Sequence, residues 1–195
     1  MSSQKIKEIA LNLFTEKGYE GTSLSDIAGL VGIKKSSIYN HYSSKDELFL
    51  AIFEMSYYAE ILNTRKTFER SNISILDQLK DFMDIRISRL SNNTTTKFLF
   101  RFIIYPPYHL KAQIELMSQN FFNEIHSIIT EAMKNSIEFH LSTDEQINEQ
   151  TSLYNILLEG LLLDVLYGHN NQVQLRKESA WTIFHNTISN DLVVK

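Results

Sequence analysis

The segment from Gly18 to Leu48 has the residue types and spacing in this chain that point most clearly to a function. It holds two runs of helical pattern separated by Gly32, and then Ser44-Lys45-Asp46-Glu47, a capping box that starts a further helix. Two short helices around a glycine-containing turn are typical of a helix-turn-helix, which presents one helix end to DNA. The sequence therefore predicts a helix-turn-helix at about residues 23–42.

The charge distribution limits how this segment could bind DNA. The chain of 195 residues has a formal net charge of −4, and its first 50 residues hold six lysines and six acidic residues. The acidic excess therefore lies in the remainder of the chain. Such a chain is not a non-specific coat for nucleic acid. Binding must come from the local placement of lysines and of helix N-termini, which attract anions.

The motifs of common enzyme classes are missing from the sequence. There is no Gly-rich phosphate loop, no His-Glu-x-x-His and no nucleophile elbow, and the six histidines are scattered. The absence of cysteine excludes disulfides, thiolate metal sites and thiol nucleophiles. An enzyme is therefore the least favoured class, and we predict neither a cofactor nor a metal site.

No signal segment opens the chain, and its densest apolar stretch is too short to span a bilayer. That stretch, residues 153–167, also contains Glu159 and Asp164. We therefore expect a cytoplasmic protein that makes no contact with a membrane.

The spacing of apolar residues predicts an all-α fold without strands. Glycines and prolines mark several ends: Gly18 ends the first helix, Gly32 the second, and Pro106-Pro107 the sixth. A break is possible in the seventh, near Ser118. The expected helices cover about residues 4–17, 23–31, 35–42, 45–70, 75–90, 97–105, 110–139, 143–167 and 174–192. We predict a DNA-binding domain at 1–48 and a helical effector-binding and dimerisation bundle at 49–195.

The residue types of the first fifty positions follow a pattern that is found in a known protein family. The chain resembles the TetR family of bacterial transcriptional regulators, closely over about the first fifty residues and beyond them only in length and helical character. The pattern that carries the resemblance is Gly18-Tyr19-x-x-Thr22-Ser23, then Ile27-Ala28, Val31-Gly32-Ile33, Ile38-Tyr39-x-His41-Tyr42 and Ser44-Lys45-Asp46-Glu47-Leu48.

The resemblance implies a role in DNA binding for each matching position. Thr22 and Ser23 would bind a phosphate at the start of the second helix. Lysine suits guanine and asparagine suits adenine in the major groove, and backbone contacts fix the register. The groove residues would be Lys35, Ser36, Ser37 and Asn40, and the backbone residues would be Tyr39, His41 and Lys45.

One position departs from the family pattern. Lys34 stands where the family usually has serine or a similar N-cap, and lysine cannot cap a helix. Two alternatives follow: the recognition helix begins later, at Ser36, or its first turn is frayed without DNA. Lys34 remains among the candidate DNA contacts.

Aromatic residues are abundant in the second part of the chain. In the resembled family this part encloses a small-molecule pocket, and ligand pockets are apolar with a few convergent polar groups. The candidate effector-binding residues are Tyr58, Phe98, Arg101, Phe102, Tyr105, Phe122 and His126. The alternative is that these aromatics form ordinary core. Arg101, if buried, needs a partner such as Glu159, Asp164 or an anionic ligand.

The last two helices are predicted to form a homodimer interface. Apolar residues surround much of the circumference of the helix at 153–166, and a companion surface is offered by Trp181, Ile183, Phe184 and Ile188. Burial of these residues within one subunit is the alternative, and the two do not exclude each other. Two subunits related by a twofold axis would place two heads on a pseudo-palindromic operator in double-stranded DNA. The leading interpretation is a repressor released by a small apolar or aromatic effector. The alternative is a DNA-binding adaptor of the same fold that recruits a protein partner.

Overall fold

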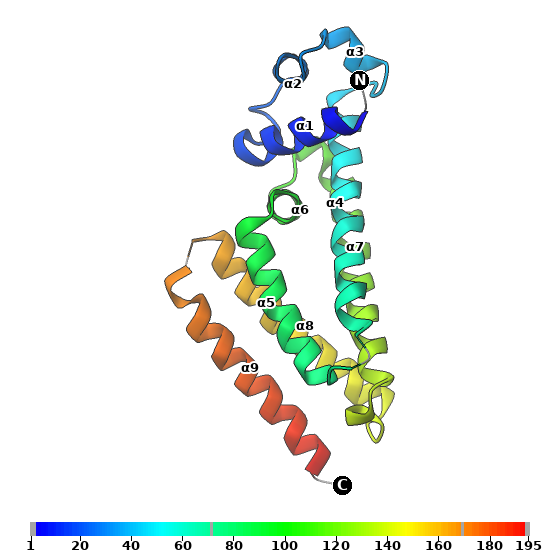
Figure 1. Ribbon diagram of the computed structural model, residues 1–195, viewed down its shortest axis with the longest axis vertical. Helices are drawn as coiled ribbons and strands as arrows, with labels where there is room; N and C mark the ends of the chain where they lie inside the picture. The colour runs from blue at the N-terminus through cyan, green and yellow to red at the C-terminus, as the bar shows by residue number, and fades with distance from the viewer. Residues whose placement is uncertain (1–2, 71, 169, 194–195) are drawn as a thin grey trace. The chain divides into compact units, whose positions relative to one another are not determined.

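The computed structural model describes residues 3–70, 72–168 and 170–193, and this described part is helical without strands (Figure 1). The predicted all-α fold is therefore confirmed. Two short 3₁₀ turns, Tyr108–Leu110 and Ile137–Phe139, flank α7. The α-helices are α1 (Ser3–Lys17), α2 (Leu24–Val31), α3 (Lys35–Tyr39), α4 (Lys45–Phe68), α5 (Ile75–Asn92), α6 (Thr94–Ile104), α7 (Lys111–Lys134), α8 (Asp144–Leu166) and α9 (Asn170–Val193).

The contacts divide the chain into two compact units that do not follow chain order. The first unit comprises Met1–Glu60 and Asn92–Gln119, and the second comprises Ile61–Ser91 and Asn120–Lys195. Helices α4 and α7 thus each contribute to both units. The predicted functional boundary after residue 48 falls inside α4.

An aromatic core holds the first unit together. Phe49 of α4 packs edge-on against Phe14 of α1 at 5.2 Å between ring centroids, and against Phe102 of α6 at 4.8 Å. Phe98 of α6 lies 5.4 Å from Phe49, and all four rings are buried. Burial of such large side chains from three helices fixes α1 on α4 and α6.

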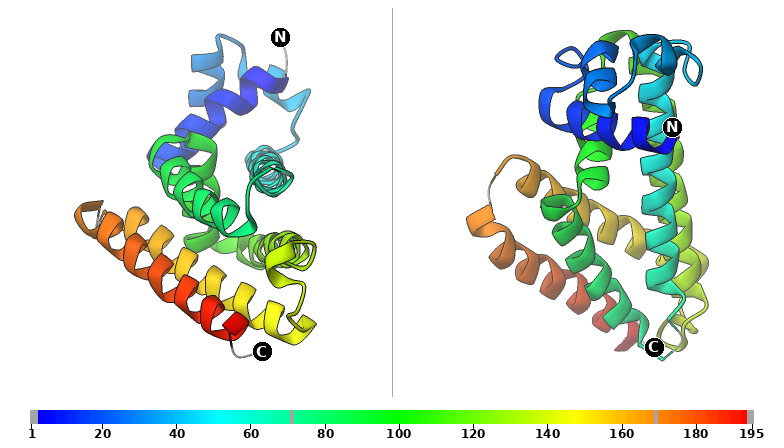
Figure 2. Two further views of the ribbon diagram at one scale, coloured as in Figure 1. Left: turned by 60° about the horizontal axis from the view of Figure 1, so that its bottom comes forward. Right: turned by 45° about the horizontal axis from the view of Figure 1, so that its top comes forward.

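The second unit is centred on the pairing of α8 with α9, which lie side by side and antiparallel (Figure 2). Tyr154 of α8 is fully buried against Phe184 of α9, with 5.2 Å between their ring centroids. Its hydroxyl donates to the Leu79 carbonyl of α5 over 2.6 Å. Burial raises the pKa of Tyr154 well above its ordinary value, so this hydroxyl stays a donor.

Several predicted helix bounds were wrong. Helix α6 begins at Thr94 rather than Lys97, because Asn93 caps it through the Thr96 N–H, and α9 begins at Asn170 rather than Gln174. The third helix ends at Tyr39 rather than Tyr42, because the chain turns at Asn40 and the N–H groups of His41 and Tyr42 both donate to the Ile38 carbonyl. Helix α7 continues through Ser118 without a break and ends at Lys134. The hydroxyl of Ser118 donates to the Ile114 carbonyl over 2.7 Å, so its polar group is satisfied within the helix.

Candidate nucleic-acid interface

Helices α2 and α3 form the predicted helix-turn-helix, and local backbone chemistry sets its geometry. The Ser23 hydroxyl accepts the Asp26 N–H over 3.1 Å, and the Asp26 carboxylate accepts the Ser23 N–H over 3.0 Å. Gly32 ends α2 with φ of +79°, in the left-handed region that glycine adopts without strain. Ile38 is fully buried and anchors α3. The predicted cap at Ser23 and the stop at Gly32 are confirmed.

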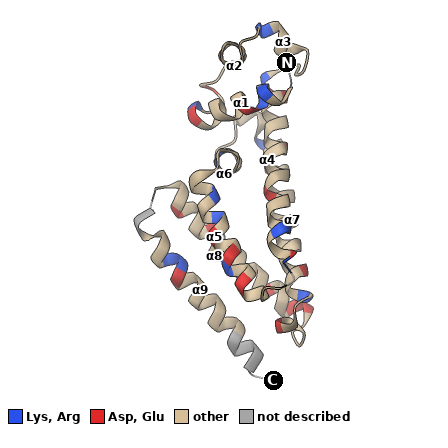
Figure 3. Cartoon of the chain, in the orientation of Figure 1, with Lys and Arg blue, Asp and Glu red and all other residues tan. Residues whose placement is uncertain are grey.

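Helix α3 begins at Lys35, one residue before the start at Ser36 that the first of the two alternatives gave. Lys34 occupies the N-cap position and makes no side-chain cap hydrogen bond, as expected of lysine. The outer face of α3 and the turn after it is open to solvent, and its basic residues are blue in Figure 3. Its exposed residues are Lys34, Lys35, Ser36, Tyr39, Asn40 and His41, with Ser37 partly exposed.

Thr22 does not take the position expected of a phosphate ligand. Its side chain is 1% exposed, and its hydroxyl donates to the Gly18 carbonyl over 2.9 Å. The hydroxyl therefore stabilises the turn after α1 and does not face solvent. Ser23 is exposed and remains a candidate, but the carboxylate of Asp26 already sits at this helix end. A phosphate here would meet a like charge.

Lys45 supports the same turn from the start of α4. Its ammonium donates to the carbonyls of Tyr19, over 3.0 Å, and Thr22, over 3.2 Å. It also lies 3.8 Å from the centroid of the Tyr19 ring, a cation–π geometry. Lys45 thus has a structural role that its sequence position did not reveal. Any contact between this lysine and DNA would use the remaining N–H of its ammonium group.

The predicted capping box at the start of α4 is only half formed. The Ser44 hydroxyl accepts the Glu47 N–H over 3.0 Å, as predicted. The Glu47 carboxylate instead accepts the backbone N–H and hydroxyl of Ser43, both over 2.6 Å. These hydrogen bonds hold the pKa of Glu47 below its usual value. The consecutive serines allow the carboxylate to cap one residue earlier than the motif implies.

Tyr19, Asp46 and His109 form a polar cluster beside this turn. The Tyr19 hydroxyl donates to the Asp46 carboxylate, and His109 Nε2 lies 3.3 Å from the same carboxylate oxygen. The hydrogen bond from Tyr19 and the contact with His109 hold the pKa of Asp46 below its ordinary value of 3.8. Burial and the neighbouring carboxylate raise the pKa of Tyr19. The cluster joins the α1–α2 turn, the start of α4 and the segment before α7.

Replacing Tyr19 with phenylalanine is expected to destabilise the protein more at neutral pH than in acid. Because the pKa of Asp46 is lowered by folding, its stabilisation is present above the ordinary pKa of 3.8 and is lost as the pH falls through the folded-state value. Urea unfolding of both proteins at about pH 7 and about pH 3 measures this difference. An equal loss of stability at both pH values would contradict the assigned hydrogen bond.

Arg101 has a different partner from those proposed from sequence. Its Nη1 donates to the Thr15 carbonyl in the last turn of α1, and neither Glu159 nor Asp164 belongs to its compact unit. The positive φ of Gly18, +76°, ends α1 here, and a Cβ at Gly18 would lie 3.3 Å from Arg101 Nη2. The guanidinium therefore closes the C-terminal end of α1, where a cation is favourable.

We expect Arg101→Met to destabilise the first unit by about 1–2 kcal/mol, since hydrogen bonds to charged groups contribute about this much when partly exposed. Arg101→Lys keeps the charge near the helix end but loses the planar fork, so we expect it to recover part of the loss. Urea unfolding compares the two variants. Equal stability of Arg101→Met and the unsubstituted protein would show that the contact contributes nothing.

The other candidate effector residues do not converge on one cavity. Phe98 and Phe102 are buried in the aromatic core of the first unit, whereas Tyr58 and Tyr105 are 58% and 62% exposed. In the second unit, His126 Nδ1 lies 3.2 Å from the Asn155 amide nitrogen. Phe122 lines a cavity of ≈20 Å³, smaller than a drug-like ligand. The alternative of ordinary core therefore describes Phe98 and Phe102.

Sequence reasoning missed two buried polar residues of α5. Arg86 is 4% exposed and lies 5.7 Å from the Phe121 ring centroid, and Gln78 is 7% exposed. Both stand in the apolar stripe of α5, each four residues from Phe82. A polar residue within such a stripe was the signal that could have found them. Burial raises the pKa of Glu159, and the nearby Arg86 opposes this shift.

The described residues contain neither a candidate metal site nor a helix that could span a membrane. No group of three or more histidine and acidic side chains among them is placed to hold a metal ion. None of the helices they form is long and apolar enough to cross a membrane.

Residues 6–52 match the family model described as bacterial regulatory proteins, tetR family. The biofilm operon icaADBC HTH-type negative transcriptional regulator IcaR of Staphylococcus epidermidis is 31% identical over 156 residues, 80% of this chain and 66% of that protein. IcaR of Staphylococcus aureus (strain Newman) is 37% identical over 99 residues, 51% of this chain and 44% of that protein. The chain thus spans less than two thirds of these curated relatives.

A solved structure shares the fold along nearly the whole chain. SmeT, the repressor of the Stenotrophomonas maltophilia multidrug efflux pump SmeDEF, superposes with a TM-score of 0.72 at 16% identity. The superposition covers 96% of this chain and 90% of SmeT. The family model covers the same α1-to-α4 segment that builds the helix-turn-helix, and the similarity to IcaR extends well beyond it. This chain belongs to the TetR family of bacterial transcriptional regulators.

Proposed function

We propose that this protein is a sequence-specific DNA-binding repressor that acts as a homodimer. The observation that carries the proposal is the outer face of α3, where polar and basic side chains are exposed while Ile38 holds the helix in place. A rigid helix with a polar outer face suits the major groove, and exposed lysines suit its phosphates. The description of IcaR as a negative regulator and of SmeT as a repressor supports repression over activation.

The last two helices offer the surface for the proposed dimer. Four large apolar side chains of α8 and α9 are exposed in the single subunit: Ile156 at 67%, Leu163 at 43%, Leu175 at 68% and Ile183 at 56%. A Cβ added at Gly160 of α8 would meet no atom within 4 Å. Exposed apolar side chains on a helix pair are typical of an interface, and a second copy would cover them.

A small-molecule effector is the proposed release signal. Release requires a ligand whose affinity differs between the DNA-competent and incompetent states. Within the first unit, α6 contacts the end of α1 through Arg101, so a shift of α6 would act on the helix that supports the helix-turn-helix. The adaptor alternative draws support from the exposed Tyr105 and from Tyr108, which is 92% exposed, because exposed aromatics suit a protein partner.

Fluorescence anisotropy with the DNA upstream of the protein's own coding region tests the proposal. The expected result is saturable binding to one fragment that a scrambled fragment of equal length does not compete away. Equal affinity for both fragments at every salt concentration would overturn the proposal, because uniform binding carries no sequence information.

A further inference from the structure

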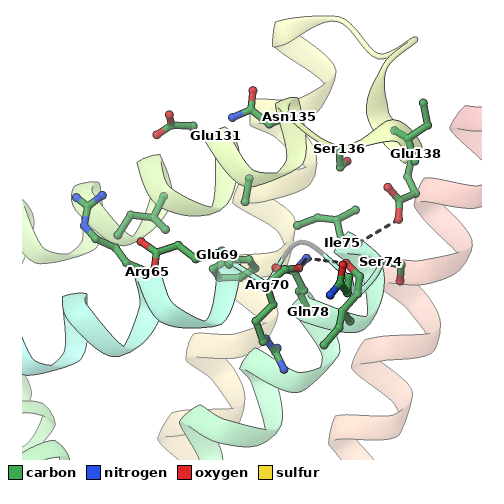
Figure 4. Close-up of a pocket in the computed structure, with 16 residues that line it drawn as sticks. Arg65, Glu69, Arg70, Ser74, Ile75, Gln78, Glu131, Asn135, Ser136 and Glu138 are labelled. Atoms are coloured by element: carbon green, nitrogen blue, oxygen red, sulfur yellow. Dashed lines mark hydrogen bonds between the residues drawn. The ribbon is translucent and has the colours of Figure 1, made fainter.

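Many polar side chains of the described residues already have partners within the chain. In the open pocket at the end of α4, Gln78 donates to the Ile73 carbonyl over 2.8 Å, and Glu138 accepts the Ile75 N–H over 3.0 Å (Figure 4). Such hydrogen bonds stabilise the fold, and the groups that make them are not free for a ligand. The side chains available to DNA are those that the fold leaves without such contacts.

His41 has no such side-chain contact, in contrast to two other histidines. His109 Nε2 lies 3.3 Å from an Asp46 carboxylate oxygen, and His126 Nδ1 lies 3.2 Å from the Asn155 amide nitrogen. The His41 imidazole forms no hydrogen bond or ion pair with any residue that the structure describes. It is an exposed ring, and both of its nitrogens are available to a partner outside the chain.

The backbone fixes the position of His41 while its imidazole stays open to solvent. The His41 N–H donates to the carbonyl of the fully buried Ile38 over 2.9 Å. The next residue, Tyr42, is 7% exposed, and its hydroxyl lies 2.6 Å from Ser3 Oγ at the start of α1. The His41 ring lies 6.5 Å from the Tyr42 ring between centroids. A fixed backbone presents the imidazole at the outer face of α3 and the turn after it, so binding has little backbone ordering to offset.

The acidic groups of the elements around His41 are engaged by other residues. The helices next to α3 and its following turn carry Glu8 of α1, Asp26 of α2, and Asp46 and Glu47 of α4. These four accept hydrogen bonds from Gln4, Ser23, Tyr19 and Ser43, respectively. The hydrogen bonds hold the pKa of Asp26, Asp46 and Glu47 below its ordinary value, so these carboxyls stay ionised between about pH 5.5 and about pH 8. A change of affinity over this range therefore does not come from them.

The other charged groups of these elements are basic. They are Lys5 and Lys7 of α1, Lys34 and Lys35 of α3, and Lys45 of α4. Like charges do not stabilise an imidazolium, whereas a DNA phosphate beside it does. DNA can therefore supply the counter-charge that the engaged carboxylates do not.

We propose that His41 takes up a proton when the protein binds its operator, so that operator affinity rises as the pH falls below neutral. Histidine ordinarily changes its charge between about pH 5 and about pH 8. A neutral imidazole donates a hydrogen bond to a phosphate, and an imidazolium donates one that is roughly twice as strong. By linkage, protons that bind more tightly to the complex tighten the complex. The proposal rests on the proposed function, because it requires the outer face of α3 and the turn after it to meet the DNA backbone.

Anisotropy with the operator fragment at two pH values and constant ionic strength measures the linkage. The unsubstituted protein is expected to bind at least about tenfold more tightly at about pH 5.5 than at about pH 8, because each head of the dimer gains a charge-assisted contact. His41→Gln keeps a polar side chain that cannot titrate, so its affinity is expected to change by no more than about threefold over the same range. Each protein is compared with itself, so a lower overall affinity of the variant does not affect the result. A full pH effect that survived His41→Gln would overturn the proposal.

Two other histidines serve as matched controls. His140→Gln removes an exposed histidine of the second unit, and His109→Gln removes the histidine that contacts Asp46. Both variants are expected to keep the pH effect of the unsubstituted protein. If the effect disappeared in His109→Gln and persisted in His41→Gln, the titrating group would be His109, and the proposal would be wrong.

Isothermal titration of the operator fragment in PIPES and in Tris counts the protons directly, because the two buffers release very different heats when they give up a proton. At about pH 7 the unsubstituted protein is expected to take up protons on binding, and His41→Gln is expected to take up almost none. Specific binding without proton uptake by the unsubstituted protein would overturn the linkage and leave the repressor function standing. Equal affinity for the operator and for a scrambled fragment at both pH values would instead overturn the repressor function on which the linkage rests.

Discussion

Tyr39→Ala is expected to weaken operator binding at least about tenfold while leaving the fold intact. Tyr39 is 49% exposed at the end of α3, so its removal leaves no large cavity. A tyrosine at the groove edge would position the helix through a hydrogen bond to a DNA phosphate, and losing a hydrogen bond to a charged group costs about 1.5–3 kcal/mol. Anisotropy with the operator fragment measures the change.

Tyr58→Ala is the matched control for this prediction. Tyr58 is 58% exposed on α4, outside the helix-turn-helix, so its replacement removes the same side chain from a different surface. We expect operator affinity within about twofold of the unsubstituted protein for this control. If Tyr39→Ala behaved like Tyr58→Ala, the outer face of α3 would not be the DNA-binding surface.

Ile156→Asp is expected to convert the dimer into monomers and to weaken operator binding by about a hundredfold or more. Ile156 is 67% exposed in the subunit, so aspartate is tolerated there in a monomer. In the proposed interface, two uncompensated carboxylates would be desolvated near the twofold axis. Loss of the link between two heads removes a gain of about 10²–10⁴ in avidity.

Sedimentation equilibrium measures the oligomeric state directly, and anisotropy gives the affinity. Leu116→Asp serves as control, since Leu116 is 59% exposed on α7 and lies outside the α8–α9 face. We expect the control to remain dimeric and to bind the operator normally. A dimer that survived Ile156→Asp would place the interface elsewhere.

Much of the helix-turn-helix was predictable from sequence because its capping and stop residues act locally. Ser23, Asp26 and Gly32 set the ends of α2 through contacts within a few residues, and these appeared as predicted. The end of α3 was harder, since it depends on Tyr42, whose hydroxyl lies 2.6 Å from Ser3 Oγ, far away in sequence. Such a tertiary contact overrides the helical pattern of a short segment.

The candidate site residues also divide into those whose surroundings are set locally and those whose surroundings depend on tertiary contacts. Exposure of Ser36 followed from its position two residues before the buried Ile38, on the opposite side of α3, which is a local property. The partners of Lys45 and Arg101 depend on which helix ends meet in space, whereas Thr22 donates to Gly18, only four residues before it. Each of these three side chains donates a hydrogen bond to a backbone carbonyl at the end of α1 or in the turn that follows it. A lysine or arginine in sequence does not show whether its charge serves the fold or a ligand.

Hydroxyl-radical footprinting of the upstream DNA tests the central claim most directly, namely that two α3 helices of a twofold dimer read one pseudo-palindromic site. The account predicts two protected half-sites of inverted sequence, with centres one helical turn of about 10 base pairs, or a multiple of it, apart. Ile156→Asp should abolish both protections at the same protein concentration. Protection spread evenly along the fragment, or a single unpaired half-site, would contradict the account.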